Sequence, residues 1–331
     1  MMNKKILITG GAGYIGSHIA WDFLDAGFRV LVVDNLCTGI REMSPNAAEF
    51  VDGDIGDAGL LDSVFRGGDI GAVVHVAGSA IVPESVADPG KYYRNNTAAS
   101  LVLMESCARH KVRDIIFSSS SAVQHGTPGE FLDETMPNIT VSPYGTSKLM
   151  TEQMLADIGA AHGIRWCALR YFNVCGADPL MRTGDCKRNA TTLVKVAMEC
   201  AAGLRPQVQI FGDDYDTEDG TAVRDYIHVS DIASAHRLAL SHLESGGAGG
   251  AFNIGIGRGF SVREVLAATK RVSGADFDTP TMPRRAGDPP RVVANPSKAR
   301  RELHFCAKHP QLDDMLKTAW QWQTRQNTNN K

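Results

Sequence analysis

The chain has 331 residues, of which 43% are hydrophobic and 21% charged, and its formal net charge is −3. This length predicts one large domain or two closely joined ones, and the composition excludes a disordered, collagen-like or coiled-coil protein. A mildly acidic chain is not expected to bind nucleic acid or an anionic membrane surface.

The first half of the chain alternates short apolar runs with helical patterns. Runs typical of buried strands occupy residues 6–8, 30–33, 72–76, 115–117 and 166–172, and helical patterns lie at 17–26, 92–110 and 143–162. Continuous apolar strands separated by helix-length segments predict an α/β fold, in which a doubly wound parallel sheet is covered by helices on both faces.

The character of the sequence changes after Asn173. Loops become longer, Gly and Asp gather between 212 and 220, and helices are expected near 192–202, 230–244 and 261–272. We therefore predict a Rossmann-type domain over residues 1–173, to which segments at about 225–255 return, and a smaller substrate domain formed mainly by 174–331.

Seven cysteines are scattered along the chain without a C-x-x-C pair. This usage predicts neither disulfides nor a metal site, and it favours a reducing cytoplasm. The apolar run at the N-terminus ends at Gly10, and no later window holds about 18 uninterrupted apolar residues, so we expect no signal peptide and no membrane span.

A glycine-rich segment follows the first expected strand and opens the first helix. Gly10, Gly13 and Gly16 would allow a tight turn, close approach of the backbone to a pyrophosphate and close packing of helix on strand. The free N–H groups of the helix N-terminus would bind the phosphates. A glycine pattern alone fits a structural turn equally well.

Asp34 ends the second expected strand, about 20 residues further on. A carboxylate at this place accepts hydrogen bonds from ribose hydroxyls and repels a 2′-phosphate, so the sequence favours NAD over NADP. The alternative is that Asp34 is only a turn residue before Asn35.

A second group of residues predicts proton and hydride chemistry. Tyr144 and Lys148 lie four residues apart near the start of a helix whose N-cap would be Ser142, and Ser120 lies at the end of an apolar strand. A free tyrosine titrates at about 10, but a nearby ammonium and a positive nicotinamide ring would favour its phenolate. Tyr144 could then act as the base while Ser120 orients the same oxygen; the alternatives are a surface tyrosine and a solvated serine loop.

With these residues in place, the chain resembles the extended short-chain dehydrogenase/reductase family and, within it, the UDP-glucose 4-epimerases. The resemblance extends from Lys4 to about Gln321. It rests on GGAGYIGSH at 10–18, DNL at 34–36, GDI at 53–55, AG at 77–78, ES at 84–85, YYRNN at 92–96, SPYGTSKLM at 142–150, RYFN at 170–173, DGTAVRDYIHVSD at 219–231 and RRAGD at 284–288.

The resemblance implies a role for each matching residue. Besides the loop glycines, it implies NAD contacts from Tyr14, Ile15, Asp34, Asn35, Asp54, Ile55, Ala77, Gly78, Asn95, Tyr144, Lys148 and Phe172. It implies Ser120, Tyr144 and Lys148 as the catalytic residues. For the UDP-sugar it implies contacts from Ser120, Tyr144, Asn173, Thr192, Leu193, Phe211, Arg224, Arg285, Asp288 and Val292. Guanidinium groups suit a pyrophosphate, so the two arginines agree with this assignment.

The reaction implied by the resemblance is reversible 4-epimerisation of a UDP-hexose such as UDP-glucose or UDP-galactose. The C4 hydride passes to tightly held NAD, the 4-keto sugar swings about the pyrophosphate, and hydride returns to the other face of the sugar. The family also implies a homodimer formed through paired helices like those at 92–110 and 143–162.

Several positions depart from the family pattern. The strand-end motif reads Val123-Gln124-His125-Gly126 without the usual tyrosine, which leaves Ser121 as an alternative to Ser120. Ala80 replaces a common lysine, and Thr192 replaces an expected His or Asn. Val292 stands where a tyrosine excludes N-acetylated sugars in some members, so we expect some tolerance of UDP-N-acetylhexosamines.

Other functions on the same fold remain as alternatives. A pentose or uronate 4-epimerase would need the same residues, whereas a 4,6-dehydratase or a decarboxylase is less favoured. Ser121-Ala122 follows Ser120 where a dehydratase carries an acidic pair. A non-catalytic protein that senses NAD is least favoured, because Tyr144 and Lys148 are both present.

Overall fold

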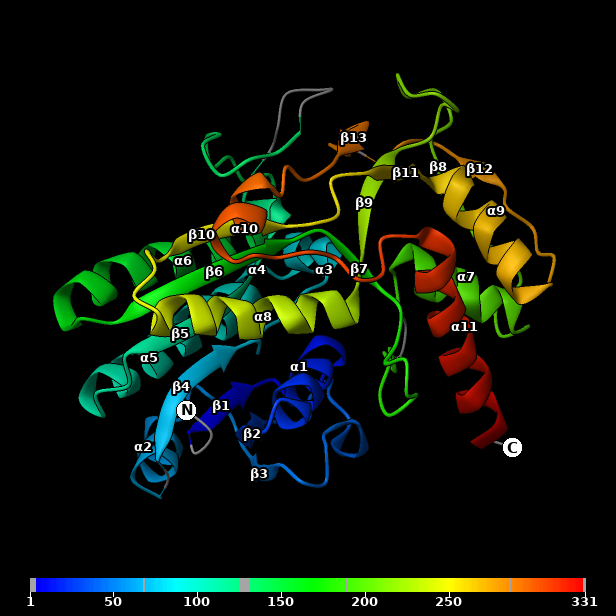
Figure 1. The fold of residues 1–331 in the computed structure, drawn as a ribbon. Coiled ribbons are helices and arrows are strands. Elements are labelled where there is room, and N and C mark those ends of the chain that lie inside the picture. Colours follow the sequence, from blue (N-terminus) through cyan, green and yellow to red (C-terminus); the bar gives the residue numbers. More distant parts are fainter. Residues whose placement is uncertain (1–3, 68, 125–130, 188–189, 286, 330–331) are drawn as a thin grey trace.

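The fold is described from a computed structural model, which covers residues 4–67, 69–124, 131–187, 190–285 and 287–329. His125 and Gly126 of the altered strand-end motif lie outside these residues. A parallel sheet forms the centre of the molecule, with the strand order β10-β6-β5-β4-β1-β2-β3 (Figure 1). Its strands are β1 (Lys5–Thr9), β2 (Arg29–Asp34), β3 (Glu49–Asp52), β4 (Ile70–His75), β5 (Asp114–Ser120), β6 (Arg165–Tyr171) and β10 (Gly250–Ile254). The predicted Rossmann-type fold is confirmed.

The central strands of the sheet are buried on both faces, because each carries an apolar run, whereas the edge strand β3 is partly exposed. Successive residues of β1 alternate between the two faces: Ile6 and Ile8 join one core and Leu7 the other. Helices α1 (Tyr14–Asp25) and α8 (Val229–Glu244) cover the first face, and α2 (Ala58–Gly67), α5 (Ala99–Arg109) and α6 (Pro143–His162) cover the second (Figure 1). The chain reverses its direction of winding between β1 and β4, and ligands bind at such a reversal.

Smaller elements of the second half lie beyond the carboxyl ends of these strands. The strand β9 (Val223–His228) pairs with β7 (Asn173–Cys175), β11 (Gly259–Ser261) and β13 (Arg291–Val292), while β8 (Ile210–Phe211) pairs with β12 (Thr281–Met282). Helices α7 (Leu193–Ala201), α9 (Val262–Ser273) and α11 (Leu312–Asn329) pack together beside them, and α10 (Ser297–Glu302) packs against β10.

The path of the chain bears on the predicted division into domains. The chain leaves the main sheet at Tyr171, where β6 ends. It returns with α8, which packs on this sheet, and with β10, whereas β9 belongs to the smaller sheet. A boundary near residue 173 stays a prediction.

Several short helical segments lie around the ends of the strands. They are η1 (Arg41–Met43), α3 (Val82–Ala87), α4 (Pro89–Tyr92), η2 (Tyr93–Ala98) and η3 (Ser121–Val123). The expected continuous helix over 92–110 is thus divided, because η2 is a π-helix that precedes α5. Such π segments are frequent at functional sites.

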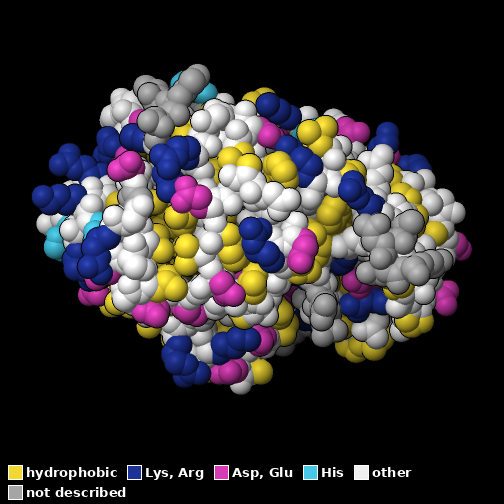
Figure 2. All heavy atoms as spheres, turned by 90° about the horizontal axis from the view of Figure 1, so that it is seen from below, with side chains coloured by type: hydrophobic (Ala, Val, Ile, Leu, Met, Phe, Trp, Pro, Cys, Tyr) yellow, Lys and Arg dark blue, Asp and Glu magenta, His cyan; other side chains and the backbone are white. Residues whose placement is uncertain are grey.

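Charges of both signs are interspersed over the surface. On the face seen in Figure 2, Lys and Arg side chains lie among Asp and Glu side chains, with apolar side chains between them. Across the described part of the chain, no helix is long and apolar enough to cross a membrane.

Candidate active site

The turn between β1 and α1 carries the predicted dinucleotide loop. Gly10 has a φ of +71°, and a Cβ atom at this position would lie 2.7 Å from the backbone nitrogen of Ala77. A Cβ atom on Gly16 would lie 2.0 Å from the carbonyl oxygen of Gly10. Gly13 is the N-cap of α1 and no side chain caps the helix there. The backbone N–H groups of the first turn are therefore suited to bind a pyrophosphate.

Tyr14 and Ile15 follow this loop, but their side chains face the protein. The Tyr14 hydroxyl donates a hydrogen bond to the Gly176 carbonyl at 2.6 Å, and burial raises the pKa of the hydroxyl. Ile15 packs against the core of the first face. Any contact of these two residues with a dinucleotide phosphate would thus come from their backbone.

Two carboxylates mark the ends of β2 and β3. Asp34 is 8% exposed and accepts hydrogen bonds from the backbone of Ala12 and Leu36, each at 2.9 Å. Asp54 accepts from the Asn35 side chain at 2.8 Å and lies beside the buried Ile55. Since each carboxylate oxygen has two lone pairs, Asp34 can stabilise the turn and still accept ribose hydroxyls.

Ser120, Tyr144 and Lys148 meet where β5 ends and α6 begins. Ser142 caps α6 by accepting from the Gly145 N–H at 3.2 Å, and Pro143 occupies the first turn. A Cβ atom on Gly145 would lie 2.2 Å from the Ala122 carbonyl oxygen, so only glycine lets the helix approach the end of β5 this closely.

The electrostatics around Ser120, Tyr144 and Lys148 differ in part from expectation. Burial raises the pKa of Tyr144, and a hydrogen bond with Ser120 lowers it. The Lys148 ammonium, which was expected to lower this pKa, instead donates to the Ser118 carbonyl at 2.9 Å and lies over the Phe117 ring. Ser120, rather than Ser121, is the hydroxyl that the structure brings to Tyr144.

The predicted pyrophosphate residues gather on the smaller sheets. Arg224 on β9 forms an ion pair with Asp288, and the Arg285 guanidinium lies 3.9 Å from the centre of the Phe211 ring. Asn173 begins β7, where it pairs with Tyr226 of β9.

The predicted sugar-size position lies nearby. Val292 pairs in register with Arg224 and packs against the apolar cluster of Leu132, Phe172 and Ala294. The half-buried Val292 side chain thus lies between Arg224, its partner on β9, and Phe172, which follows β6 of the large sheet.

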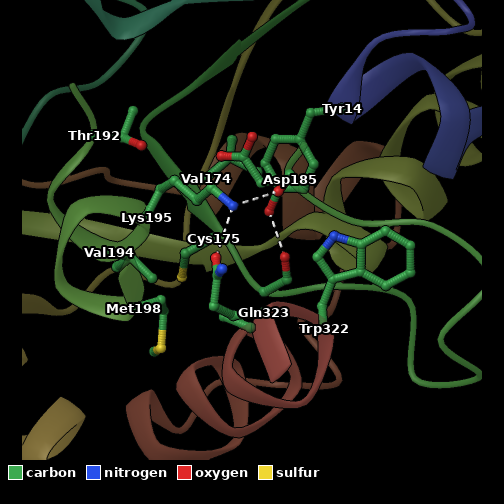
Figure 3. A pocket seen from close by; sticks show the side chains of 12 residues that line it. Tyr14, Val174, Cys175, Asp185, Thr192, Val194, Lys195, Met198, Trp322 and Gln323 are labelled. Atoms are coloured by element: carbon green, nitrogen blue, oxygen red, sulfur yellow. Dashed lines mark hydrogen bonds between the residues drawn. The ribbon is translucent and has the colours of Figure 1, made fainter. Parts of the chain in front are cut away.

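Thr192 and Leu193 begin α7 beside a small cavity. Thr192 lines this cavity together with Tyr14, while Leu193 packs into the apolar clusters under α9. Figure 3 shows the Lys195 ammonium between Asp185 and Gln323. The cavity of about 20 Å³ admits a water molecule but no sugar, so it is not the sugar pocket.

Comparison with known proteins decides the family. The NAD dependent epimerase/dehydratase family matches residues 6–255. The chain belongs to this family. It is 50% identical to the UDP-glucose 4-epimerase of Azospirillum brasilense over 97% of this chain and 92% of that protein.

Solved structures of family members agree with this assignment. The crystal structure of UDP-glucose 4-epimerase from Brucella ovis in complex with NAD has a TM-score of 0.93 and 42% identity, covering 96% of this chain and 98% of that one. The UDP-Glc/GlcNAc 4-epimerase from Campylobacter jejuni has a TM-score of 0.85 and 44% identity, covering 97% and 99%. As a family member, the protein is an isomerase that depends on NAD, and its glycine loop and Asp34 fit that cofactor.

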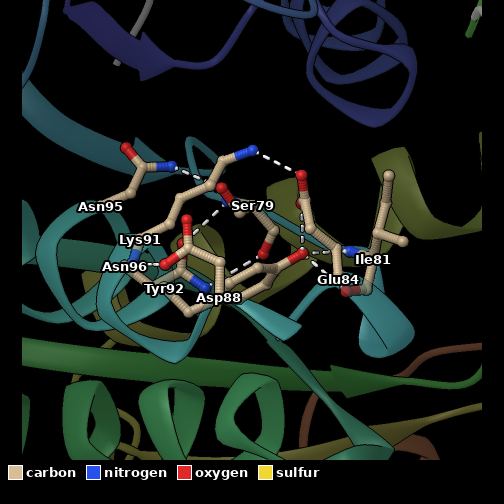
Figure 4. Close-up of polar contacts among 8 residues, drawn as sticks. All are labelled: Ser79, Ile81, Glu84, Asp88, Lys91, Tyr92, Asn95 and Asn96. Atoms are coloured by element: carbon tan, nitrogen blue, oxygen red, sulfur yellow. Dashed lines mark hydrogen bonds and ion pairs between the residues drawn. The ribbon is translucent and has the colours of Figure 1, made fainter. Parts of the chain in front are cut away.

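A polar network beside Tyr144 was not predicted from the sequence. Asn96 accepts from the Ser79 N–H at 2.7 Å (Figure 4). It also donates to the Ser147 hydroxyl at 3.0 Å, which fixes the strand-end turn after Ala77-Gly78 against α6. Asn95 donates to the Ser79 hydroxyl at 2.9 Å.

Tyr92 extends this network toward Tyr144. It is fully buried, and its hydroxyl contacts Glu84 at 2.8 Å (Figure 4). Its ring meets the Tyr144 ring edge-on. The motifs YYRNN and ES contain these residues, but only Asn95 was selected from them. Taking the two motifs together could have identified this network, because Tyr92 of YYRNN contacts Glu84 of ES.

Proposed function

We propose that the protein catalyses reversible 4-epimerisation of a UDP-hexose, with UDP-glucose and UDP-galactose as the substrate pair. The observation that carries this proposal is the Ser120–Tyr144 hydrogen bond at the carboxyl end of β5, which lies two strands from β1 and its dinucleotide loop in the same parallel sheet. A base at this place can act on a sugar carbon while the diphosphate is held by guanidinium groups.

The residues of the chain then have distinct tasks. Tyr144 removes the proton from the C4 hydroxyl and later returns it, while Ser120 hydrogen-bonds the same oxygen and orients it. NAD, when bound, supplies the acceptor and donor of the C4 hydride, so no net redox change occurs. We propose that the Lys148 ammonium, although it donates to the Ser118 carbonyl, still favours the Tyr144 phenolate through its charge one helical turn away when NAD is bound.

Arg224 and Arg285 hold the pyrophosphate while the rest of the sugar turns. Asp288 keeps Arg224 in place, and the stacking of Arg285 on Phe211 keeps that guanidinium near the expected uracil site. Binding through the diphosphate leaves the hexose free to present either face to the cofactor.

Turnover of a panel of UDP-sugars by the purified protein tests the proposal. We expect interconversion of UDP-glucose and UDP-galactose without added NAD, and a transient NADH absorbance on mixing. Faster turnover of a UDP-pentose or UDP-uronate would favour those 4-epimerases instead, and NAD binding without turnover would indicate a sensor.

The side chain at position 292 is expected to set the size of the sugar. The Val292 side chain is short, so we expect turnover of UDP-N-acetylglucosamine as well as UDP-glucose. Val292→Tyr should lower kcat/KM for the N-acetylated sugar by about 10- to 200-fold and leave UDP-glucose nearly unaffected, because the larger ring fills the pocket.

The control for this prediction is Val292→Ala, which keeps the pocket open and should preserve both activities. Competition between the two sugars in one reaction measures the ratio directly. A wild-type protein that ignores UDP-N-acetylglucosamine would contradict the assignment of Val292.

The assembly and the compartment are also part of this proposal. We expect a homodimer formed through α5 and α6, which pack side by side and expose Leu101 and Met150 to solvent at 37% and 43%. Burial of these side chains by a second copy would remove apolar surface from water. The molar mass in solution, measured by light scattering, tests this.

The seven cysteines are free and support a cytoplasmic location. No group of three or more His, Cys, Asp or Glu side chains in the described residues could hold a metal ion. Neither the net charge nor the interspersed surface charges favour binding to nucleic acid.

A further inference from the structure

A buried ion pair lies directly behind the catalytic residues. Glu152 on α6 and Arg170 on β6 are 5% and 3% exposed, and their side chains form two hydrogen bonds of 3.0 and 2.5 Å. Burying such a pair costs desolvation that the mutual attraction barely offsets, so stability alone is a poor reason for it. The arginine Nη1 atom is buried without a hydrogen-bond partner among the described residues.

This pair belongs to a regular set of contacts between α6 and β5. Along one face of the helix, each of three residues four apart contacts one of three consecutive serines. Tyr144 meets Ser120, Lys148 donates to the Ser118 carbonyl at 2.9 Å, and Glu152 accepts from the Ser119 hydroxyl at 2.5 Å. The carboxylate thus lies one helical turn beyond the ammonium, on the same side of the helix.

Glu152 is also the source of negative charge for Lys148. Burial lowers the pKa of Lys148 to about 8, and the charge of Glu152 opposes that shift. Burial and the Lys148 charge lower the pKa of His75 to about 3, so this imidazole is neutral, while burial raises the pKa of Tyr144. Arg170 carries the positive charge that is paired with Glu152. His75 is held in place by hydrogen bonds with Thr9 and Ser100.

We propose that Glu152 is a positioning residue that keeps Lys148 in its charged form behind Tyr144, with Arg170 and Ser119 holding the carboxylate in place. This inference rests on the proposed function, in which the active state combines a Lys148 ammonium with a Tyr144 phenolate. Removing the carboxylate charge favours deprotonation of both groups, and it acts more on Lys148, which is one turn away rather than two. The active charge state then becomes rarer.

The test is the pH dependence of kcat/KM for UDP-glucose, measured on the NAD-loaded protein. Glu152→Gln should lower the maximum at least about tenfold and move the pH optimum down by about one unit, because the apparent pKa values of the coupled pair both fall. Ser119→Ala is the matched control: it removes one hydrogen bond to Glu152 but keeps the charge, so the pH optimum should not move.

A second variant separates the charge effect from simple loss of the ion pair. Glu152→Gln leaves Arg170 buried and unpaired, which destabilises the fold. The double variant Glu152→Gln/Arg170→Met removes both charges. It should recover the wild-type melting temperature while its pH optimum stays low, and it carries the test even if the single variant does not fold.

The outcomes distinguish this inference from the proposed function. A wild-type pH optimum in the double variant, or in a folded Glu152→Gln protein, would overturn the role of Glu152 while the epimerase activity stands. Absence of UDP-hexose turnover by the wild-type protein would overturn the proposed function and the inference with it.

Discussion

Tyr144→Phe is expected to lower kcat for UDP-glucose by about 10²- to 10⁴-fold, the usual contribution of a positioned general base. The substitution removes the oxygen that accepts the substrate proton and that forms the hydrogen bond with Ser120. The ring keeps its edge-on contact with Tyr92, so the packing at the start of α6 should be preserved. Steady-state interconversion of UDP-glucose and UDP-galactose measures the loss.

The NAD content and the melting temperature of this variant serve as its internal controls. Both should remain close to the wild-type values, because the phenylalanine ring keeps the packing of Tyr144 and the glycine loop that would bind the pyrophosphate is unchanged. Ser120→Ala should lose less activity, since Ser120 orients the oxygen but does not carry its proton. A Tyr144→Phe protein within threefold of wild-type turnover would contradict the assignment of the base.

The large sheet could be predicted because its signal is local. In β1, β2 and β5 the residues 6–8, 30–33 and 115–117 form unbroken apolar runs, and nearly every residue of these strands is buried, which is typical of central parallel strands. The glycine loop and the Ser142-Pro143 cap could also be predicted, since a turn and a helix start each depend on a few adjacent residues. The positions of Ser120, Tyr144 and Lys148 near one strand end and one helix start could therefore be predicted from the sequence, while their catalytic role stays a proposal.

The elements that the sequence did not predict depend on contacts between distant segments of the chain. The strands β8, β12 and β13 have two residues each, which is too short to show any periodicity. The π-helix that divides 92–110 is accompanied by the contacts of Asn96 with Ser79 and Ser147. Each of these contacts joins residues at least 17 positions apart.

The contacts of Lys148 and Tyr144 also depend on segments that are distant in the sequence. Their spacing placed both residues on one helical face, as found, but it could not show that the ammonium turns to the Ser118 carbonyl. Nor could it show the Glu152–Arg170 pair, because Arg170 lies in a strand that looks apolar and is separated from Glu152 by 18 residues. Periodicity identifies which residues share a face, whereas partners across the sheet require the fold.

Gly16→Ala is expected to destabilise the protein without NAD by about 1–3 kcal/mol, the usual cost of overpacking. The new methyl would lie 2.0 Å from the Gly10 carbonyl oxygen and 2.9 Å from the Gly11 Cα, and real Cβ contacts essentially never lie under 3.0 Å. The helix and the loop must therefore separate. Thermal unfolding of the protein stripped of NAD, together with the NAD retained after purification, measures both effects.

The expected loss of stability is opposite to what helix propensity predicts, because alanine is a better helix former than glycine by about 1 kcal/mol. Helix propensity alone predicts that Gly16→Ala stabilises α1, whereas the close approach of the loop predicts the opposite. Gly13→Ala is the matched control: a Cβ there meets the Gly10 carbonyl oxygen at 3.3 Å, and the φ of −80° suits alanine. Its melting temperature should change little, while NAD retention falls because the methyl lies where the pyrophosphate approaches. If Gly16→Ala raised the melting temperature, the tight packing of α1 on the glycine loop would be refuted, and with it the steric requirement for glycine at position 16.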